Sequence, residues 1–111
     1  MTPPPRQLPE FVTFVLDQLH ELEQVRAKRM FGGYGLYQRD TFFGIIHEDR
    51  LYLKTDDESR PEFTKRGSAP FQPTPRQTLH TYLETPAEII ENPRSLTEWA
   101  ERAVRAKLGE I

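Results

Sequence analysis

Residues 29–54 read RMFGGYGLYQRDTFFGIIHEDRLYLK and contain three short apolar and aromatic runs, at 34–37, 42–46 and 51–53. The breaks between the runs are polar and four residues long, so consecutive runs are expected to pair as an antiparallel meander. In the third run leucine alternates with tyrosine and lysine, which is typical of a strand with one buried face. This stretch therefore predicts an antiparallel sheet that forms one side of a hydrophobic core.

Glycines are concentrated at the start of the first run, because Gly32 and Gly33 precede it and Gly35 is its second residue. Glycine permits a positive φ and lets another backbone segment come close, so one of these properties is expected to be used. A dinucleotide-binding loop would need a further glycine three residues after Gly35, followed by a helix, but that position is a glutamine and a strand follows. We interpret the segment, together with Met30 and Phe31, as a structural motif at the entry to the sheet.

Helical patterns flank the meander on both sides. Apolar residues at helical spacing predict one long helix over residues 9–23 and another over residues 92–108. Two short motifs, at residues 59–62 and 85–88, have the form of capping boxes and are expected to start shorter helices. The sheet is therefore expected to be covered by helices from both ends of the chain.

The remaining segments complete the sheet. Residues 25–31 fit either a strand or the lead-in to the glycine turn. Residues 68–76 contain three prolines and are expected to form a loop with at most an edge strand at Phe71, while residues 77–84 alternate and predict a strand that returns to the sheet. The predicted fold class is α+β, a two-layer domain in which an antiparallel sheet is packed by the two long helices.

Length and composition limit the class of protein. A chain of 111 residues is one domain by size, with residues 1–8 expected to be a proline-rich flexible tail and residues 9–111 the domain. The net charge of −2 argues against a protein whose main task is to coat nucleic acid or membrane. Cysteine is absent, and neither a membrane span nor a signal peptide is indicated, so a cytoplasmic location is expected.

No group of residues indicates catalysis or a cofactor. The histidine–glutamate pairs at 20–21 and 47–48 resemble the start of a zinc-protease helix, but the second histidine is missing from both. The consecutive acids at 56–58 lack the spacing of a calcium loop and precede a helix start, where negative charge is favoured. We therefore expect no catalytic residue, no cofactor and no metal.

Basic and aromatic residues are the best indication of a binding surface. The candidate interaction surface consists of Arg26, Lys28, Arg29, Tyr34, Tyr37 and Tyr52. Tyrosine and arginine are enriched at protein interfaces, and tyrosines on a sheet face also stack on bases in single-strand nucleic-acid binders. Solvated charges and half-buried core tyrosines are the plain alternative. A second basic cluster lies in the last helix, at residues 102–107.

The run RMFGGYGLY at residues 29–37, joined to RLYLKTD at residues 50–56, resembles the N-terminal domain of the TfoX/Sxy competence regulators. The resemblance continues to the final helix through Trp99 and Ala100. It implies an α+β fold similar to secretion chaperones, with the element order α-β(3)-α-β(2)-α, and by analogy with that fold a homodimer.

The resemblance also implies a function. The better-known family members are cytoplasmic bacterial regulators of natural competence that work with the cyclic-AMP receptor protein at particular promoters and are not enzymes. They carry a second, C-terminal domain, so a chain ending at Ile111 is expected to be a stand-alone domain. The first hypothesis is a non-enzymatic regulatory or adaptor domain that binds a protein partner such as a transcription factor. Direct nucleic-acid binding through the basic patches and sheet-face tyrosines is the alternative, and a small enzyme or metal protein ranks last.

Overall fold

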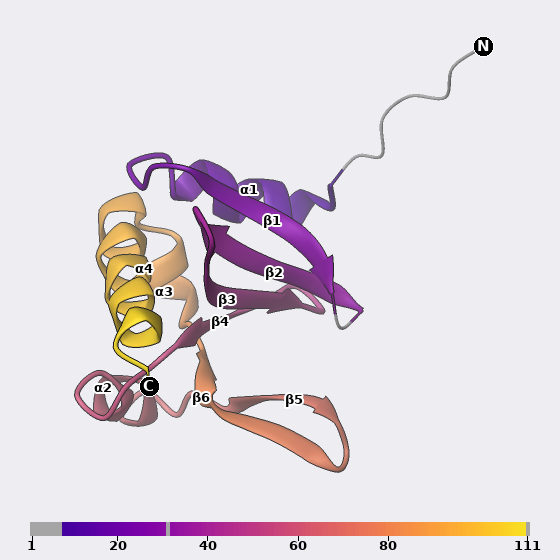
Figure 1. Ribbon diagram of the computed structural model, residues 1–111, viewed down its shortest axis with the longest axis vertical. Helices are drawn as coiled ribbons and strands as arrows, with labels where there is room; N and C mark the ends of the chain where they lie inside the picture. The colour runs from indigo at the N-terminus through magenta and orange to yellow at the C-terminus, as the bar shows by residue number, and fades with distance from the viewer. Residues whose placement is uncertain (1–7, 31, 111) are drawn as a thin grey trace.

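A six-stranded antiparallel sheet carries the helices on one of its faces (Figure 1). The computed structural model describes residues 8–30 and 32–110. The elements in chain order are α1 Glu10–Gln18, β1 Val25–Met30, β2 Gly33–Gln38, β3 Thr41–His47, β4 Arg50–Lys54, α2 Arg60–Thr64, β5 Pro70–Thr74, β6 Gln77–Glu84, α3 Ala87–Ile90 and α4 Pro93–Leu108. The predicted α+β class is confirmed.

The strands lie in the order β1-β2-β3-β4-β6-β5. The first four form a continuous meander, because short polar turns join each strand to the next. After α2, strand β6 returns to pair with β4, and β5 forms the far edge as a hairpin with β6 that projects from the rest of the molecule (Figure 1). The predicted meander, the returning strand and the edge strand at Phe71 are all confirmed.

The expected element order is wrong at two points, since the observed order is α-β(4)-α-β(2)-α-α. Residues 25–30 are a true strand: every residue pairs with β2, and half-buried Val25 and Ala27 alternate with exposed Arg26 and Lys28. The last helical region is split because Asn92 is extended, with φ −110° and ψ 106°. A residue before proline avoids helical geometry, so α3 and α4 are separate helices.

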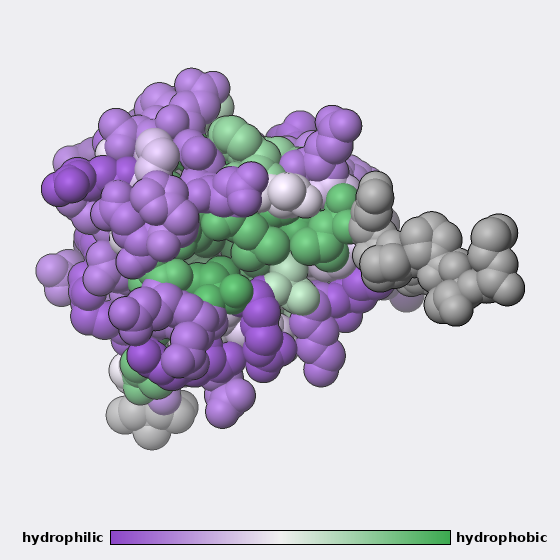
Figure 2. All heavy atoms as spheres, turned by 90° about the horizontal axis from the view of Figure 1, so that it is seen from above, coloured by the Kyte–Doolittle hydropathy of each residue, from purple (hydrophilic) through white to green (hydrophobic). Residues whose placement is uncertain are grey.

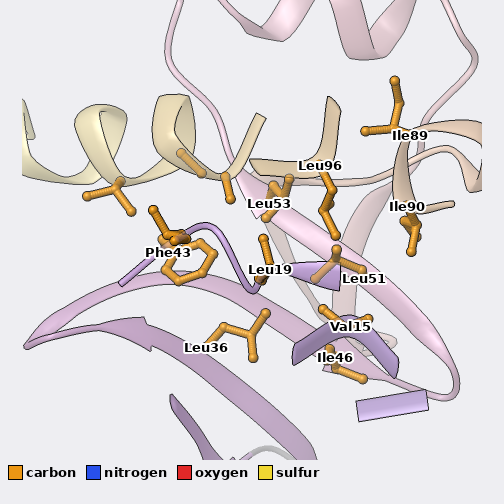
Figure 3. Close-up of a cluster of buried hydrophobic side chains, with 14 of the residues drawn as sticks. Val15, Leu19, Leu36, Phe43, Ile46, Leu51, Leu53, Ile89, Ile90 and Leu96 are labelled. Atoms are coloured by element: carbon orange, nitrogen blue, oxygen red, sulfur yellow. The ribbon is translucent and has the colours of Figure 1, made fainter. Parts of the chain in front are cut away.

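The main core lies between the sheet and the helices α1, α3 and α4. Figure 3 shows side chains from both layers pointing toward one another. The labelled core residues are Val15, Leu19, Leu36, Phe43, Ile46, Leu51, Leu53, Ile89, Ile90 and Leu96. Fully burying a Leu, Ile or Phe side chain contributes about 1.5–3 kcal/mol each, so this cluster is the main source of stability.

Helix α1 is shorter than expected, because it ends at Gln18 and not near Glu23. Leu19 and Leu22 still reach the core from the turns that follow, with exposed fractions of 1% and 9%. Gln24 then takes a positive φ of 56° before β1 begins. The apolar spacing thus marked buried residues correctly but extended the helix over a turn.

The predicted capping box at residues 59–62 is wrong. Ser59 makes no side-chain cap to its helix; its Oγ accepts the N–H of Asp56 at 3.1 Å. Asp56 is the capping residue of this turn, since its Oδ1 accepts the N–H groups of Glu58 and Ser59 at 3.1 and 2.8 Å. These bonds to the charged form, chiefly that from Ser59, lower the pKa of Asp56.

The second predicted capping box, at residues 85–88, is also wrong. No side chain caps α3, and the buried Thr85 hydroxyl has no hydrogen-bond partner among residues 8–30 and 32–110. The start of α4 is as predicted, because Asn92 Oδ1 accepts the N–H of Ser95 at 3.1 Å. Gly109 ends this helix, also as predicted.

The glycines ahead of β2 serve both purposes expected of them. Gly32 has a φ of 74°, which favours glycine. A Cβ on Gly33 would lie 2.2 Å from the carbonyl oxygen of Ile46, so only glycine lets β3 approach. A Cβ on Gly35 would lie 2.6 Å from Met30 Sδ. Phe31, the remaining residue of the predicted motif, lies outside the described residues.

Candidate interaction surface

The sheet face that points away from α1, α3 and α4, which we call the outer face, carries a second cluster of side chains. Its members are Ile45, Tyr52, Phe71 and Tyr82, with Phe42 and Leu79 partly buried against them. All of these residues belong to strands, and among the described residues no helical side chain joins the cluster. The outer face is therefore an aromatic surface built by the sheet itself.

A β-bulge in β3 decides which of the adjacent rings of Phe42 and Phe43 faces the main core. Leu36 pairs with Gly44, but Tyr37 pairs with Phe42, which leaves Phe43 as the extra residue. A bulge interrupts the strict alternation of side chains. Phe43 consequently belongs to the main core, fully buried, while Phe42 joins the outer cluster.

A row of cations and rings crosses the outer face from β1 to β6. The Arg26 guanidinium lies 4.7 Å from the ring centroid of Tyr37, and Tyr37 lies 5.3 Å from Phe42. Phe42 continues the row to Tyr82 at 5.5 Å, and Lys54 Nζ lies 5.2 Å from the Tyr82 centroid. We call these five residues the cation–aromatic row. Cation–ring contacts of this kind contribute about 0.5–2 kcal/mol each and hold the groups in place.

The two ends of the row differ in exposure. The Arg26 side chain is 53% exposed and makes a long ion pair of 3.8 Å with Asp40, whereas Lys54 is only 7% exposed. Tyr82 is buried, and burial raises its pKa well above the usual range, so its hydroxyl stays neutral. The part of the row available to a partner is thus Arg26 with the half-buried rings of Tyr37 and Phe42.

A groove of about 520 Å³ lies beside the row, between the β3–β4 turn and β5. Its walls include His47 and Tyr52 on one side and Pro70, Phe71 and Pro73 on the other. The Phe71 ring contacts Tyr52 at 5.0 Å and His47 at 5.4 Å. Burial also raises the pKa of Tyr52, which keeps this phenol neutral. The remaining wall residues include the polar side chains of Glu48, Gln72 and Thr74. Among the described residues, no hydrogen bond joins a nucleophile to a base in this groove.

The comparison with known protein families is decisive at this point, because the family model for the TfoX N-terminal domain matches residues 17–107. This chain belongs to the TfoX N-terminal domain family. The match covers every strand and the helices α2, α3 and nearly all of α4. The family is linked to the regulation of competence and transformation, and it is not a known enzyme family.

Two curated relatives place this TfoX N-terminal domain further. DNA transformation protein TfoX1 of Aliivibrio fischeri is 27% identical over 86 residues, which cover 76% of this chain and 41% of that protein. A protein of Spirochaeta aurantia, described as an uncharacterized 12.7 kDa protein in the trpE 5′ region, is 38% identical over 53 residues, or 48% of this chain and 46% of that protein. The chain thus spans less than half the length of these relatives.

The structure of this TfoX N-terminal domain places the six predicted surface residues on two faces. Arg26, Lys28, Tyr37 and Tyr52 lie on the outer face, with Tyr52 buried in the cluster. Tyr34 packs against the main core on the helix side, and Arg29 pairs with it across β1 and β2. The outer face therefore unites four of the six.

Sequence reasoning missed Phe42, Phe71 and Tyr82 as members of the outer face. The alternation in β4 predicted that Lys54 shares the face of Tyr52, but Lys54 was not included in the candidate surface. The face of Phe42 could not be predicted because of the bulge, since the adjacent Phe42 and Phe43 give no indication in sequence of which ring faces the core. Phe71 belongs to β5 and Tyr82 to β6, and both are more than thirty residues away from Tyr37 in sequence. The alternation in residues 77–84 was the available signal, because it already set Tyr82 apart from Leu83.

The basic cluster of the last helix is largely paired. Arg102 donates to Glu62 at 2.5 Å, and Lys107 donates to Glu110 at 3.0 Å. Across residues 8–30 and 32–110, no three His, Asp or Glu side chains are grouped so that they could hold a metal ion. None of the helices described is long and apolar enough to cross a membrane.

Proposed function

We propose that this TfoX N-terminal domain is a non-enzymatic regulatory or adaptor module that binds another protein through its outer face. Its setting is bacterial cytoplasm and competence-type transcriptional regulation, where the partner is a transcription factor or a protein that controls one. The family membership supports the regulatory setting. The observation that carries the proposal is the exposed end of the cation–aromatic row, where Arg26, Tyr37 and Phe42 lie together and no helix within residues 8–30 and 32–110 packs on them.

The exposed end of the row has the properties of a binding hot spot. Arginine and tyrosine are enriched among residues that contribute most to protein–protein affinity. Their side chains lose conformational freedom on binding, and this cost is smaller when they are already held in place. Arg26 on Tyr37 and Tyr37 on Phe42 are held by their mutual packing in the free chain.

Direct nucleic-acid binding is the second hypothesis and is less well supported. Single-strand binders need aromatic rings with open faces beside a basic groove. On this outer face Tyr52 and Tyr82 are buried, and in the last helix Arg102 and Lys107 already pair with acids. A protein partner needs no such open rings, which is why we favour it.

The proposal is tested by capture from native host cytosol with the tagged chain, with and without nuclease, quantified by mass spectrometry. Two variants remove the hot spot, Arg26→Glu and Tyr37→Ser. The matched controls Arg94→Glu and Arg105→Glu reverse exposed charges on α4, which packs on the face of the sheet opposite Arg26 and Tyr37. A stoichiometric partner that survives nuclease and is lost at least fivefold only with the first pair supports the proposal. A partner retained equally by all four variants overturns it, and partners lost with nuclease favour nucleic-acid binding.

A further inference from the structure

The two edges of the sheet differ in their capacity to accept another strand. β5 forms one edge and contains Pro70 and Pro73, which lack N–H groups and discourage edge pairing. β1 forms the other edge, and its sequence VRAKRM contains no proline. Its register with β2 is continuous from Val25 to Met30. Only the β1 edge is therefore regular and able to donate along its length.

The backbone groups of β1 alternate between β2 and the open edge. Arg39 donates its N–H to the carbonyl of Gln24 at 3.0 Å, so these two residues form a hydrogen-bonded pair. Such pairs alternate with non-hydrogen-bonded pairs in an antiparallel ladder, and the register then assigns Val25, Ala27 and Arg29 to the open edge. Their N–H and C=O groups form the row that an added strand of about six residues needs.

The side chains of β1 divide between two different surfaces. Arg26 and Lys28 project on the outer face and are exposed. Val25 and Ala27 project toward the helix side and are only half-buried against the main core. A strand placed beside β1 therefore meets Arg26 and Lys28 on one face, and on the other the apolar surface of Val25 and Ala27 followed by exposed Arg29.

Apolar surface is open between α1 and β1. Figure 2 looks onto this side of the molecule and shows a hollowed apolar strip with hydrophilic residues along both borders. The partly buried apolar residues on this side are Leu16 of α1 and Val25 and Ala27 of β1. Phe11 and Phe14 lie on the other side of α1, where they line a pocket with Asp49 of the β3–β4 turn. The helix-side residues of an added strand would be directed toward this strip.

We propose that the open edge of β1 binds an extended segment of the partner protein by strand addition, and that this segment alternates acidic with apolar residues. The acidic side chains lie beside Arg26 and Lys28, and the apolar ones cover the strip between α1 and β1. Main-chain bonds supply affinity in this mode of recognition, and alternate side chains supply specificity. The inference rests on the proposed function, because it specifies the chemistry of the partner that the outer face recognises.

A second copy of this chain does not suit the same edge. Antiparallel pairing of two β1 strands centred on Ala27 would bring Arg26 and Lys28 of one chain against Lys28 and Arg26 of the other. Like charges opposite one another destabilise a strand pair, and β1 has no acidic residue to compensate. The charge of β1 therefore disfavours self-pairing and favours an acidic strand.

The direct test uses two peptides of equal length and apolar content, Ac-EVEVEVE-NH2 and Ac-KVKVKVK-NH2, with the full ¹⁵N-labelled chain. Amide hydrogen exchange and chemical shifts are followed by NMR. With the acidic peptide, exchange at the amides of Val25, Ala27 and Arg29 is expected to slow at least tenfold, and with the basic peptide it stays unchanged. The acidic peptide N-methylated at alternate residues is expected to bind at least tenfold more weakly, since its edge-facing donors are removed.

Variants of the protein test the same edge from the other side. In Ala27→Pro the lost N–H is one that faces the open edge, so the ladder with β2 keeps its bonds while affinity for the acidic peptide falls at least tenfold. The double variant R26E/K28E is expected to reverse the preference between the two peptides. Arg94→Glu and Arg105→Glu serve as matched controls and leave binding unchanged. The N-methylated peptide keeps the test decisive if Ala27→Pro does not fold.

Three results would overturn strand addition. The first is equal binding of both peptides, and the second is shift changes confined to Tyr37 and Phe42 with unaltered exchange along β1. The third is protection of the β1 amides that grows with protein concentration alone, which would assign the edge to a second copy. The proposed function fails separately: a captured partner lost with Tyr37→Ser but kept with Ala27→Pro rejects strand addition and leaves the adaptor role standing.

Discussion

Lys54 of β4 forms an ion pair with Glu110, just beyond the end of α4, although the lysine side chain is only 7% exposed. Lys54 Nζ also donates to Thr81 Oγ1 at 2.9 Å and lies over the Tyr82 ring. The pair lowers the pKa of Glu110, with the Lys54 hydrogen bond as the main cause. It connects the end of the last helix to the middle of the sheet.

Removing the acid from this pair is expected to destabilise the fold. Glu110→Ala leaves a nearly buried ammonium with the Thr81 hydroxyl as its remaining described hydrogen-bond partner, and Glu110 itself is 44% exposed. Because solvent screens that end of the pair, we expect a loss of about 1 kcal/mol in the free energy of unfolding, below the value for fully buried pairs. Chemical denaturation at pH 7 measures it.

The double variant K54M/E110A separates the pair from its surroundings. We expect it to recover most of the loss, since it removes the unpaired buried charge together with its partner. Lys107→Ala is the control, because it removes the other basic partner of Glu110 at a more exposed position. If a double-mutant cycle gives no coupling free energy between Lys54 and Glu110, the ion pair does not contribute to stability.

Gly33→Ala is expected to be among the most damaging small substitutions in the chain. The added Cβ would lie 2.2 Å from a backbone oxygen of Ile46, so β2 and β3 would have to separate. We expect a loss of at least about 2 kcal/mol, as for other overpacked sites. Thermal unfolding followed by circular dichroism provides the measurement.

Two other glycines calibrate that result. Gly35→Ala meets the flexible end of Met30 at 2.6 Å and the Phe42 ring at 2.8 Å, so it is expected to cost less than a clash with backbone because only side chains have to move. Gly109→Ala meets only ordinary contact at 3.4 Å and is expected to change stability by less than about 0.5 kcal/mol. We expect the loss of stability to increase from Gly109→Ala to Gly35→Ala to Gly33→Ala. A different order would contradict the close approach of β3 to Gly33.

The free energy of unfolding is expected to depend on pH through Asp56. Its pKa is lowered in the folded chain, so as pH falls the unfolded chain takes up the proton first. The stabilisation is fully present above the unfolded pKa of about 4 and is lost as pH falls through the lower folded pKa. Urea denaturation between pH 7 and pH 2 is expected to show this loss, and Asp56→Ala is expected to reduce stability at pH 7 by about 1 kcal/mol.

A neighbouring acid provides the control for Asp56. Asp57 accepts a bond from the Arg60 side chain and is fully exposed, so Asp57→Ala is expected to leave the stability at pH 7 almost unchanged. If both alanine variants lose the same stability, the backbone bonds to Asp56 Oδ1 are not the source.

Phe71 tests whether the outer face is a true second core. Its side chain is 1% exposed although it lies on an edge strand, and Phe71→Ala is expected to cost about 3 kcal/mol. Phe14→Ala is the matched control, because Phe14 is 41% exposed and the same change should cost under about 1 kcal/mol. Similar losses for the two variants would mean that β5 packs loosely on the sheet.

Local patterns in the sequence predicted most of the architecture. The meander, the returning strand, the cap of Asn92 and the stop at Gly109 all depend on neighbours within a few residues, and all are present. The sequence also predicted that Tyr52 faces the side of the sheet opposite Leu51 and Leu53, because alternation along one strand is a local property.

Local signals failed where several local solutions compete. Both predicted capping boxes are absent. Asp56 accepts the N–H of Ser59 and caps that turn, and α3 begins one residue later than predicted, with Pro86 and not Thr85 at its N-cap. The end of α1 at Gln18 was not predicted for a related reason. Leu19 and Leu22 are apolar because they are buried in the core, and an apolar residue in a turn that reaches the core fits the same pattern as one in a helix.

By itself the sequence determined the α+β class, the position of the strands in the meander and which of their side chains are apolar. The tertiary structure alone decided which aromatic residues meet, since Tyr37, Phe42 and Tyr82 join only through the bulge in β3 and the return of β6 beside β4. It also decided that β1 is the open edge. The physical reason is that alternation and capping act over a few residues, whereas strand order and ring contacts depend on pairing between segments far apart in the chain.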